Sequence, residues 1–325
     1  MTITTPQEIP RDRWGRPQVV PPDGGKPTAY TRCTTYVSVL EDTFNLNKWM
    51  QRMVATGLAG RPDLLLAVSG AQDDKNALNK ICDDAREAAQ ASAAATTGTA
   101  LHSLTEILDR GGDMPPVPEA YKADIEAYQQ ATSDLTAQYI EQFTVLDDLK
   151  IGGTPDRIVQ LNGQTFIADI KTGGIEYGIG KIAMQLAVYS RSQGYRFDTN
   201  ERFSLGNINQ DTGIIIHLPA GKGTCELVEV DLNAGWQAVQ IATQVREWRK
   251  RKDLSRPLAQ GPQPAPAASP EPERDMAVVY LEDKIANATS LEELRQLWVD
   301  HQTIWSDEQT SLAAARKALL EGKAA

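Results

Sequence analysis

Cysteine is scarce in this 325-residue chain, and the three cysteines that occur are widely separated. Cys33, Cys82 and Cys225 form no Cys-x-x-Cys pair. Their spacing argues against a disulfide scaffold, a zinc ribbon and a four-cysteine iron–sulfur cluster. We therefore expect a protein of a reducing compartment, the cytoplasm, that carries no iron–sulfur cofactor.

Long apolar runs are also missing. No run approaches the ~18 residues that a bilayer-spanning helix needs, and the first residues lack the apolar stretch of a secretion signal. Hydrophobic residues make up 41% and charged residues 23% of the chain, close to the globular average. At about 150 residues per domain, the length predicts about two globular domains.

Positive charge is in deficit, with 33 basic and 43 acidic residues and a net charge of −10. Residues 61–150 hold most of this deficit, with 7 basic and 16 acidic side chains, whereas residues 151–255 carry 12 and 11. The total charge argues against nucleic-acid binding by the surface as a whole. Local potential rather than total charge steers a ligand, so a nucleic-acid site outside the acidic segment stays open.

Proline and glycine divide the chain into segments. Residues 1–29 are predicted to form an extended arm, and residues 256–275 a semi-rigid Pro/Ala-rich linker. Between them, residues 30–255 are the predicted main domain. Residues 276–325 are predicted to form a helical appendage, with helices over 276–286, 291–298 and 306–320. Ser306 is the expected N-cap of the last helix, with Gln309 completing a capping box.

The pattern within the main domain changes from helical to strand-like near residue 140. Predicted helices cover residues 73–110 (with Gly98 as a break), 119–137, 179–192 and 234–251. Predicted strands cover residues 140–146, 151–161, 164–170, 213–218 and 225–230. Asn162-Gly163 between two of these strands is a strong hairpin signal. These elements predict an α/β fold with a central mixed sheet flanked by helices, helical N-terminal additions and a helical tail.

One end of this sheet carries a chemically informative pattern. Asp169 and Lys171 lie two positions apart on a predicted strand, so both face the same side. The hairpin brings Asp156 to the same end. Converging carboxylates suit a hard cation such as Mg²⁺ or Mn²⁺, and a neighbouring lysine offsets charge in a phosphodiester transition state. The alternative is a surface ion pair, although the apolar residues around Asp169 predict a buried strand, where unpaired charge is costly.

The order Pro155-Asp156, then Asp169-Ile170-Lys171, resembles the signature of the PD-(D/E)XK nuclease superfamily. Further motifs resemble its RecB-like exonuclease branch, which includes CRISPR-associated and phage-type members. They are Gly98-Thr99-Ala100-Leu101-His102 with Glu106, Gln185 to Tyr189, and Tyr30 to Thr35 followed by Leu46 and Trp49. The resemblance covers roughly residues 28–252. It implies a restriction-endonuclease-like core and metal-dependent hydrolysis of DNA.

The resemblance also implies roles for individual residues. Lys171 would be the catalytic lysine. Glu106 lies four residues after His102 on the same helix face, where it either fixes the histidine tautomer in a catalytic site or is a solvated acid. A neutral imidazole suits Mn²⁺ better than Mg²⁺; the alternative for His102 is a helix histidine that binds no metal. The implied metal ligands are His102, Asp156, Asp169 and the carbonyl of Ile170.

A second set of residues is implied to contact DNA: Gln185, Tyr189, Thr172, Arg249 and Lys250. The pair Gln185 and Tyr189, at i and i+4, would line a DNA channel, while core packing is the alternative for Tyr189. Arg249 and Lys250 belong to a basic helix end, where phosphate contacts and a favourable interaction with the helix dipole are both open interpretations.

Together these features predict a Mg²⁺- or Mn²⁺-dependent DNA exonuclease of phage recombination, replication or repair, in the host cytoplasm if the chain is phage-encoded. The sequence has no GxxxxGK[ST] phosphate loop, so it has no helicase motor of its own. Two alternatives are an endonuclease of the same superfamily and a nucleic-acid-binding or assembly protein that keeps the fold without catalysis. The C-terminal helices are predicted to dock a protein partner, and no membrane partner is expected.

Overall fold

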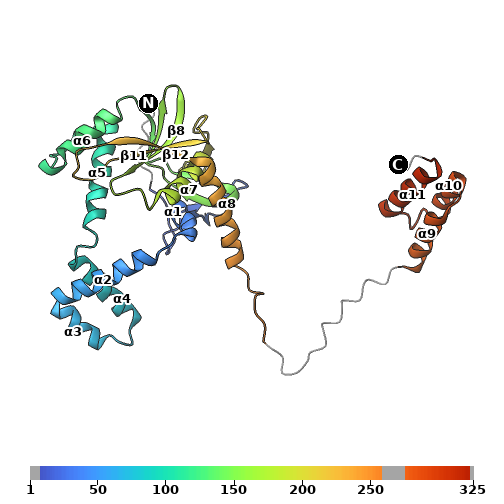
Figure 1. The fold of residues 1–325 in the computed structure, drawn as a ribbon, viewed down its shortest axis with the longest axis horizontal. Coiled ribbons are helices and arrows are strands. Elements are labelled where there is room, and N and C mark those ends of the chain that lie inside the picture. Colours follow the sequence, from blue (N-terminus) through green and yellow to red (C-terminus); the bar gives the residue numbers. More distant parts are fainter. Residues whose placement is uncertain (1–7, 258–274, 323–325) are drawn as a thin grey trace. The chain divides into compact units, whose positions relative to one another are not determined.

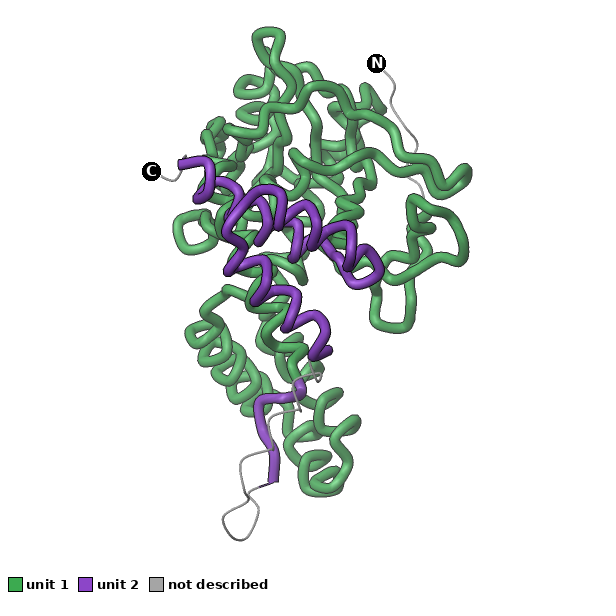
Figure 2. Tube along the Cα trace, turned by 90° about the vertical axis from the view of Figure 1, so that its right-hand side faces the viewer, with its two compact units in different colours: residues 1–251 green, residues 252–325 purple. Residues whose placement is uncertain are grey.

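The computed structural model describes residues 8–257 and 275–322 of the chain. They fall into two compact units, Met1–Arg251 and Lys252–Ala325, which are coloured separately in Figure 2. The predicted linker lies for the most part outside the described residues. Each unit is therefore described by itself. Within the described parts of the chain, no helix combines the length and the apolarity that crossing a membrane requires.

A five-stranded mixed sheet organises the first unit (Figure 1). Its strand order is β12-β11-β8-β7-β4. Strands β8 and β11 are parallel and joined through helix α7, whereas the other neighbours are antiparallel. The fold is therefore α/β with a mixed sheet, as expected. The elements are β4 (Thr136–Ile140), β7 (Arg157–Leu161), β8 (Gln164–Lys171), α7 (Ile179–Ser190), β11 (Thr212–His217) and β12 (Glu226–Asp231).

The hairpin between β7 and β8 has the geometry that its sequence predicts. Leu161 pairs with Gln164, which leaves a two-residue loop. Asn162 and Gly163 both have positive φ angles, 49° and 81°. Two consecutive positive φ values are what a type I′ turn needs, and Asn-Gly adopts them at low cost. This turn sets the register that places Asp156 across from the end of β8.

A second five-stranded sheet, of order β10-β9-β5-β6-β3, corrects two strand predictions. The strand expected over 151–161 is two strands, because residues 154–156 lead the chain from this sheet to the first one and Pro155 has no N–H for a ladder. The strand expected over 140–146 is likewise divided after Ile140. The strands are β3 (Thr31–Arg32), β5 (Thr144–Leu146), β6 (Ile151–Gly153), β9 (Gln193–Tyr195) and β10 (Arg202–Phe203).

The N-terminal segment packs against this second sheet. Strands β1 (Gln18–Val19) and β2 (Thr28–Ala29) pair with each other. Val19 is fully buried in a cluster with Tyr30, Phe143, Val145 and Tyr195. The described part of the predicted arm thus contributes apolar surface to the first unit.

Helices account for the rest of the first unit, and two of their bounds differ from expectation. Gly98 does not break a helix; the break lies at residues 89–92, and Gly98 is inside α5, where a Cβ atom would lie 2.7 Å from Thr172 Oγ1. Helix α6 ends at Ala131 rather than 137, because the chain enters β4. The helices are α1 (Cys33–Val37), α2 (Phe44–Gly60), α3 (Pro62–Gly70), α4 (Lys75–Ala88), α5 (Ala93–Asp109), α6 (Glu119–Ala131) and α8 (Leu232–Arg249), with 3-10 turns at Ser38–Leu40 and Asp147–Leu149.

The mixed sheet has a buried core on each face. On one face, Ile167 and Ile215 pack with Leu186 of α7 and Val239 of α8. On the other face, Ala168 and Ile170 belong to a cluster that includes Tyr128 of α6. Residues of β8 therefore alternate between the two cores, and Asp169 shares the face of Ile167.

The second unit contains three described helices, α9 (Met276–Asn287), α10 (Leu291–Asp300) and α11 (Asp307–Leu320). Its core consists of Leu281, Ile285, Ala288 and Leu294. The predicted capping box of the last helix is confirmed, with the side chains of Ser306 and Gln309 both engaged. This unit therefore has a core of its own.

Candidate active site

Strand pairing brings the two predicted carboxylates together. Asp156 directly precedes β7, and Arg157 pairs with Ala168, so Asp156 lies across from Asp169. The Asp156 Oδ2 atom accepts a hydrogen bond of 2.7 Å from the backbone N–H of Ile170. This bond fixes the first carboxylate against the strand that carries the second.

Helix α5 contributes His102 to the same place. His102 Nδ1 lies 3.5 Å from Asp156 Oδ2. Burial lowers the pKa of His102, although Asp169 opposes this effect. The close approach of Gly98 to Thr172, where there is no space for a side chain on the helix, brings α5 near the end of β8.

Asp169 is the most buried acid of the group, with 3% of its side chain exposed. It forms an ion pair with the ammonium of Lys171, and Gln185 Nε2 of α7 lies 3.5 Å from its Oδ1. Burial, followed by the charge of Asp156, raises the pKa of Asp169 to about 6. Burial also raises the pKa of Asp156. Two buried carboxylates in mutual repulsion make this end of the sheet favourable for positive charge.

Glu106 lies on α5 one turn beyond His102 and is paired with a cation. Arg110 Nε donates to Glu106 Oε1 at 2.8 Å. Glu106 still acts on the site through charge, because it contributes to the raised pKa of Asp156. Its position on α5, one turn from His102, fits a supporting role beside the site.

Glu141 joins this cluster, although sequence reasoning missed it. Burial, with Asp156 as the next cause, raises its pKa to about 7. Its backbone N–H donates to the carbonyl of Asp156 at 3.1 Å, and its φ angle is 52°. No motif marks this residue, because the expected strand over 140–146 concealed the turn that directs it to the site.

A buried arginine, also missed by sequence reasoning, links α5 to β7. Arg157 has 2% of its side chain exposed. Its Nε donates to Asp109 Oδ2 at 2.6 Å, and its Nη1 donates to the carbonyl of Asp156 at 2.7 Å. Tyr128 donates its hydroxyl to the same Asp109 oxygen at 2.7 Å. The network thereby connects α5, α6 and β7 directly behind Asp156.

The residues predicted to contact DNA are not gathered at one place. Gln185 faces Asp169 and Thr172 faces Gly98, so both adjoin the site. Tyr189 is 3% exposed and lies in the core, where its hydroxyl meets Cys33. Arg249 and Lys250 are exposed at the C-terminal end of α8, and Lys250 pairs with Glu247 at 2.6 Å.

A divalent cation fits the chemistry of the available donors. Among the residues that the structure describes, no three His, Cys, Asp or Glu side chains are already arranged as a metal-binding group. The donors that converge are a neutral imidazole, two carboxylates and a backbone strand, which together suit Mg²⁺ or Mn²⁺. The Lys171 ammonium beside Asp169 shows that this position accepts positive charge.

Comparison with known proteins adds no family assignment. No family model matches the chain, and no curated protein matches its sequence.

Proposed function

We propose that this protein is a metal-dependent DNA exonuclease of the RecB-like branch of the PD-(D/E)XK superfamily. One observation carries the proposal: His102 from α5, Asp156 before β7 and the Asp169–Lys171 pair on β8 converge at one end of the mixed sheet. The motifs that carry the sequence resemblance are far apart in the chain. Their convergence supports a shared chemical task.

The converging donors suggest how the site would work. His102, Asp156, Asp169 and the carbonyl of Ile170 would hold Mg²⁺ or Mn²⁺, which when bound supplies Lewis-acid activation of water and of a phosphate oxygen. Lys171 holds its positive charge beside Asp169, where it would stabilise negative charge that develops on the phosphate. Gln185, whose Nε2 lies 3.5 Å from Asp169 Oδ1, would help to orient the second carboxylate. Burial of both carboxylates keeps these charge interactions strong.

Two observations bear on the alternatives. A protein that only binds nucleic acid has no need for Asp156, Asp169 and Lys171 together, so the intact set favours catalysis. Exonuclease action, in preference to an endonuclease of the same superfamily, rests on the sequence resemblance of the His102 motif and of the Gln185–Tyr189 pattern to the RecB-like branch. A role in phage recombination, replication or repair belongs to the same proposal.

The test uses two DNA substrates of identical sequence, one linear and end-labelled and one covalently closed circular. The full chain is incubated with Mg²⁺, Mn²⁺ or EDTA beside Asp169→Ala and a control, Lys80→Ala, whose exposed lysine lies on α4. We expect metal-dependent loss of linear DNA by the wild type and the control only, with circles intact. Cleavage of circles would identify an endonuclease, and no cleavage of either substrate would favour the binding protein.

A further inference from the structure

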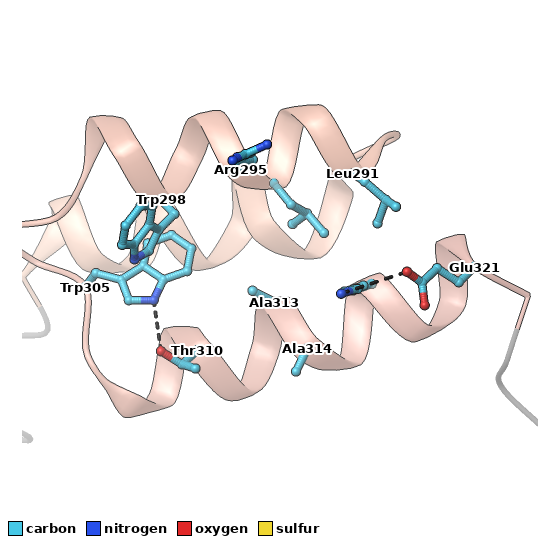
Figure 3. A pocket seen from close by; sticks show the side chains of 10 residues that line it. Leu291, Arg295, Trp298, Trp305, Thr310, Ala313, Ala314 and Glu321 are labelled. Carbon is cyan, nitrogen blue, oxygen red and sulfur yellow. Dashed lines mark hydrogen bonds and ion pairs between the residues drawn. The ribbon is translucent and has the colours of Figure 1, made fainter.

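Helices α10 and α11 of the C-terminal unit border a groove with a cavity volume of about 430 Å³ (Figure 3). Trp298 and Trp305 stand at one end, and Glu321 lies at the other (Figure 3). Ala313 and Ala314 lie between these ends on α11. Because alanine side chains are short, the groove is deep enough at its centre to admit a side chain from outside.

Part of the apolar wall of this groove packs on the core of the unit, but Trp298 does not belong to that core. The core is formed by Leu281, Ile285, Ala288 and Leu294, and Trp305 and Ala313 are partly buried against it. Trp298 nevertheless keeps 49% of its surface exposed. Trp305 is oriented by a hydrogen bond of 3.0 Å from its Nε1 to Thr310 Oγ1. A half-exposed tryptophan beside one held in place is typical of recognition surfaces, where rigid aromatic side chains supply most of the binding energy.

Charge is distributed unevenly between this groove and the rest of the unit. Over residues 275–322, the cations are Lys284, Arg295, Arg316 and Lys317, and the acids are Asp275, Glu282, Asp283, Glu292, Glu293, Asp300, Asp307, Glu308 and Glu321. Two of these four cations, Arg295 and Lys317, line the groove, but only one of the nine acids, Glu321, does so. Lys317 and Glu321 form an ion pair of 3.9 Å. The groove is therefore locally cationic in an otherwise acidic unit.

We propose that this groove binds a peptide segment of a partner protein that carries a large apolar side chain beside a carboxylate. The apolar side chain would enter the groove over Ala313 and Ala314, beside the two tryptophans, and the carboxylate would face Arg295 and Lys317. An arginine donates two parallel N–H bonds to a carboxylate, and this bidentate geometry fixes the orientation of the segment as well as adding energy. A basic segment would meet like charge at the groove and bind less well.

This inference does not rest on the proposed nuclease function. It uses only the surface of the C-terminal unit, and it holds whether or not the first unit cleaves DNA. Because both units belong to one chain, a segment bound here would keep its parent protein tethered to the first unit, which raises their effective concentration.

The test selects ligands for the full chain from a library of random twelve-residue peptides displayed on phage. We expect enriched sequences to be more acidic than the starting library and to place Leu, Phe, Met or Trp next to Asp or Glu. A labelled synthetic peptide of the most enriched sequence is then titrated by fluorescence anisotropy. We expect Trp298→Ala and Arg295→Glu each to weaken its binding about tenfold or more.

Matched controls on α9 separate this groove from the rest of the unit. Tyr280→Ala removes another half-exposed aromatic side chain, and Lys284→Glu reverses another cation, so both are expected to bind like the wild type. Circular dichroism checks that each variant is folded. If Trp298→Ala is unfolded, the affinity of Arg295→Glu for the peptide decides the test, because Arg295 is an exposed side chain.

Three results would overturn the proposal. The first is a selection that enriches no sequence or enriches basic sequences. The second is binding of the peptide by the groove variants as tight as that of the wild type. The third is self-association in sedimentation that Trp298→Ala abolishes, which would assign the groove to a second copy of this chain.

Discussion

Arg157 and Asp109 form a buried ion pair in which Arg157 Nε donates to Asp109 Oδ2 at 2.6 Å. The pair joins β7, which follows Asp156, to the C-terminal end of α5, which carries His102. The same arginine donates to the backbone carbonyl of Asp156. We therefore infer that the ion pair between Arg157 and Asp109 helps to set the distance between His102 and Asp156, although neither of these two residues belongs to the pair.

Removing Asp109 is expected to destabilise the protein. Asp109→Ala removes the hydrogen-bonded acid from the 2%-exposed Arg157 and leaves the Glu141 carboxylate, 3.9 Å away, as an ion-pair partner, which costs about 3 kcal/mol of unfolding free energy. Urea denaturation followed by circular dichroism measures this loss, with the exposed Asp134→Ala as the control. A loss below about 0.5 kcal/mol, the range of ordinary surface substitutions, would show that the pair does not hold α5 and β7 together.

Gly98 is expected to tolerate a side chain only when Thr172 is shortened. In Gly98→Ala the new methyl group would lie 2.7 Å from Thr172 Oγ1, so either the Thr172 side chain must rotate away or α5 must shift. We expect a lower melting temperature even though alanine is the better helix former. The double variant Gly98→Ala with Thr172→Ala removes the clashing oxygen and should recover stability. Equal melting temperatures for the single and double variants would contradict the close approach of these two elements.

Acid is expected to weaken the packing of the second sheet through Asp147. Burial raises the pKa of Asp147, but hydrogen bonds from Arg202 and Tyr30 outweigh it and hold the pKa below its ordinary value. For a carboxyl with a lowered folded-state pKa, the stabilisation is present above the unfolded pKa of 3.8 and is lost as pH falls through the folded pKa.

Melting temperatures between pH 3 and pH 6 test this dependence. The wild type should lose more stability below about pH 4 than Asp147→Asn, with the neighbouring exposed Asp148→Asn as the matched control. Parallel acid profiles for the wild type and Asp147→Asn would refute the assignment.

Manganese is expected to stabilise the wild type through Asp169. The pKa of this carboxyl is raised to about 6 by burial and by Asp156. A raised folded-state pKa means that the metal-free protein loses stability as pH increases from about 4 to about 6. At pH 7 the Asp169 carboxylate is ionised and Lys171 is its ion-pair partner. A bound cation would add further favourable charge interaction. We expect Mn²⁺ to raise the melting temperature of the wild type, as any ligand selective for the folded state does.

The rise in melting temperature caused by Mn²⁺ should be absent in Asp169→Asn and retained in the control Asp113→Asn, which changes an exposed acid. Asp169→Asn should also show a flatter stability profile between pH 4 and pH 6 without metal. A full Mn²⁺ shift in Asp169→Asn would exclude this carboxylate as a ligand.

Local pattern was sufficient to predict part of the site. Strand alternation places Asp169 and Lys171 on one face, and the Asn162–Gly163 turn fixes the register that brings Asp156 across from them. Both effects act within about 20 residues of chain. The α/β class follows from the same alternation of helical and strand patterns.

The rest depends on contacts between distant segments. Glu141 and Arg157 reach the site because the chain passes from one sheet to the other directly after β4 and directly before β7, and Arg157 then meets Asp109 of the distant helix α5. The spacing of Gln185 and Tyr189 shows that they share a helix face, but not that this face is buried against Cys33. Periodicity likewise could not show that Gly98 is a contact point within α5 rather than its end.

We propose that Asp156, Asp169, His102 and Lys171 form a metal-dependent nuclease site. Its most direct test is the initial rate of nucleotide release from end-labelled linear DNA at increasing Mn²⁺, for the wild type and Lys171→Ala. We predict metal-dependent release by the wild type and a rate about a thousandfold lower for Lys171→Ala at every Mn²⁺ concentration. Equal rates for the two proteins, or release that persists in EDTA, would contradict the account.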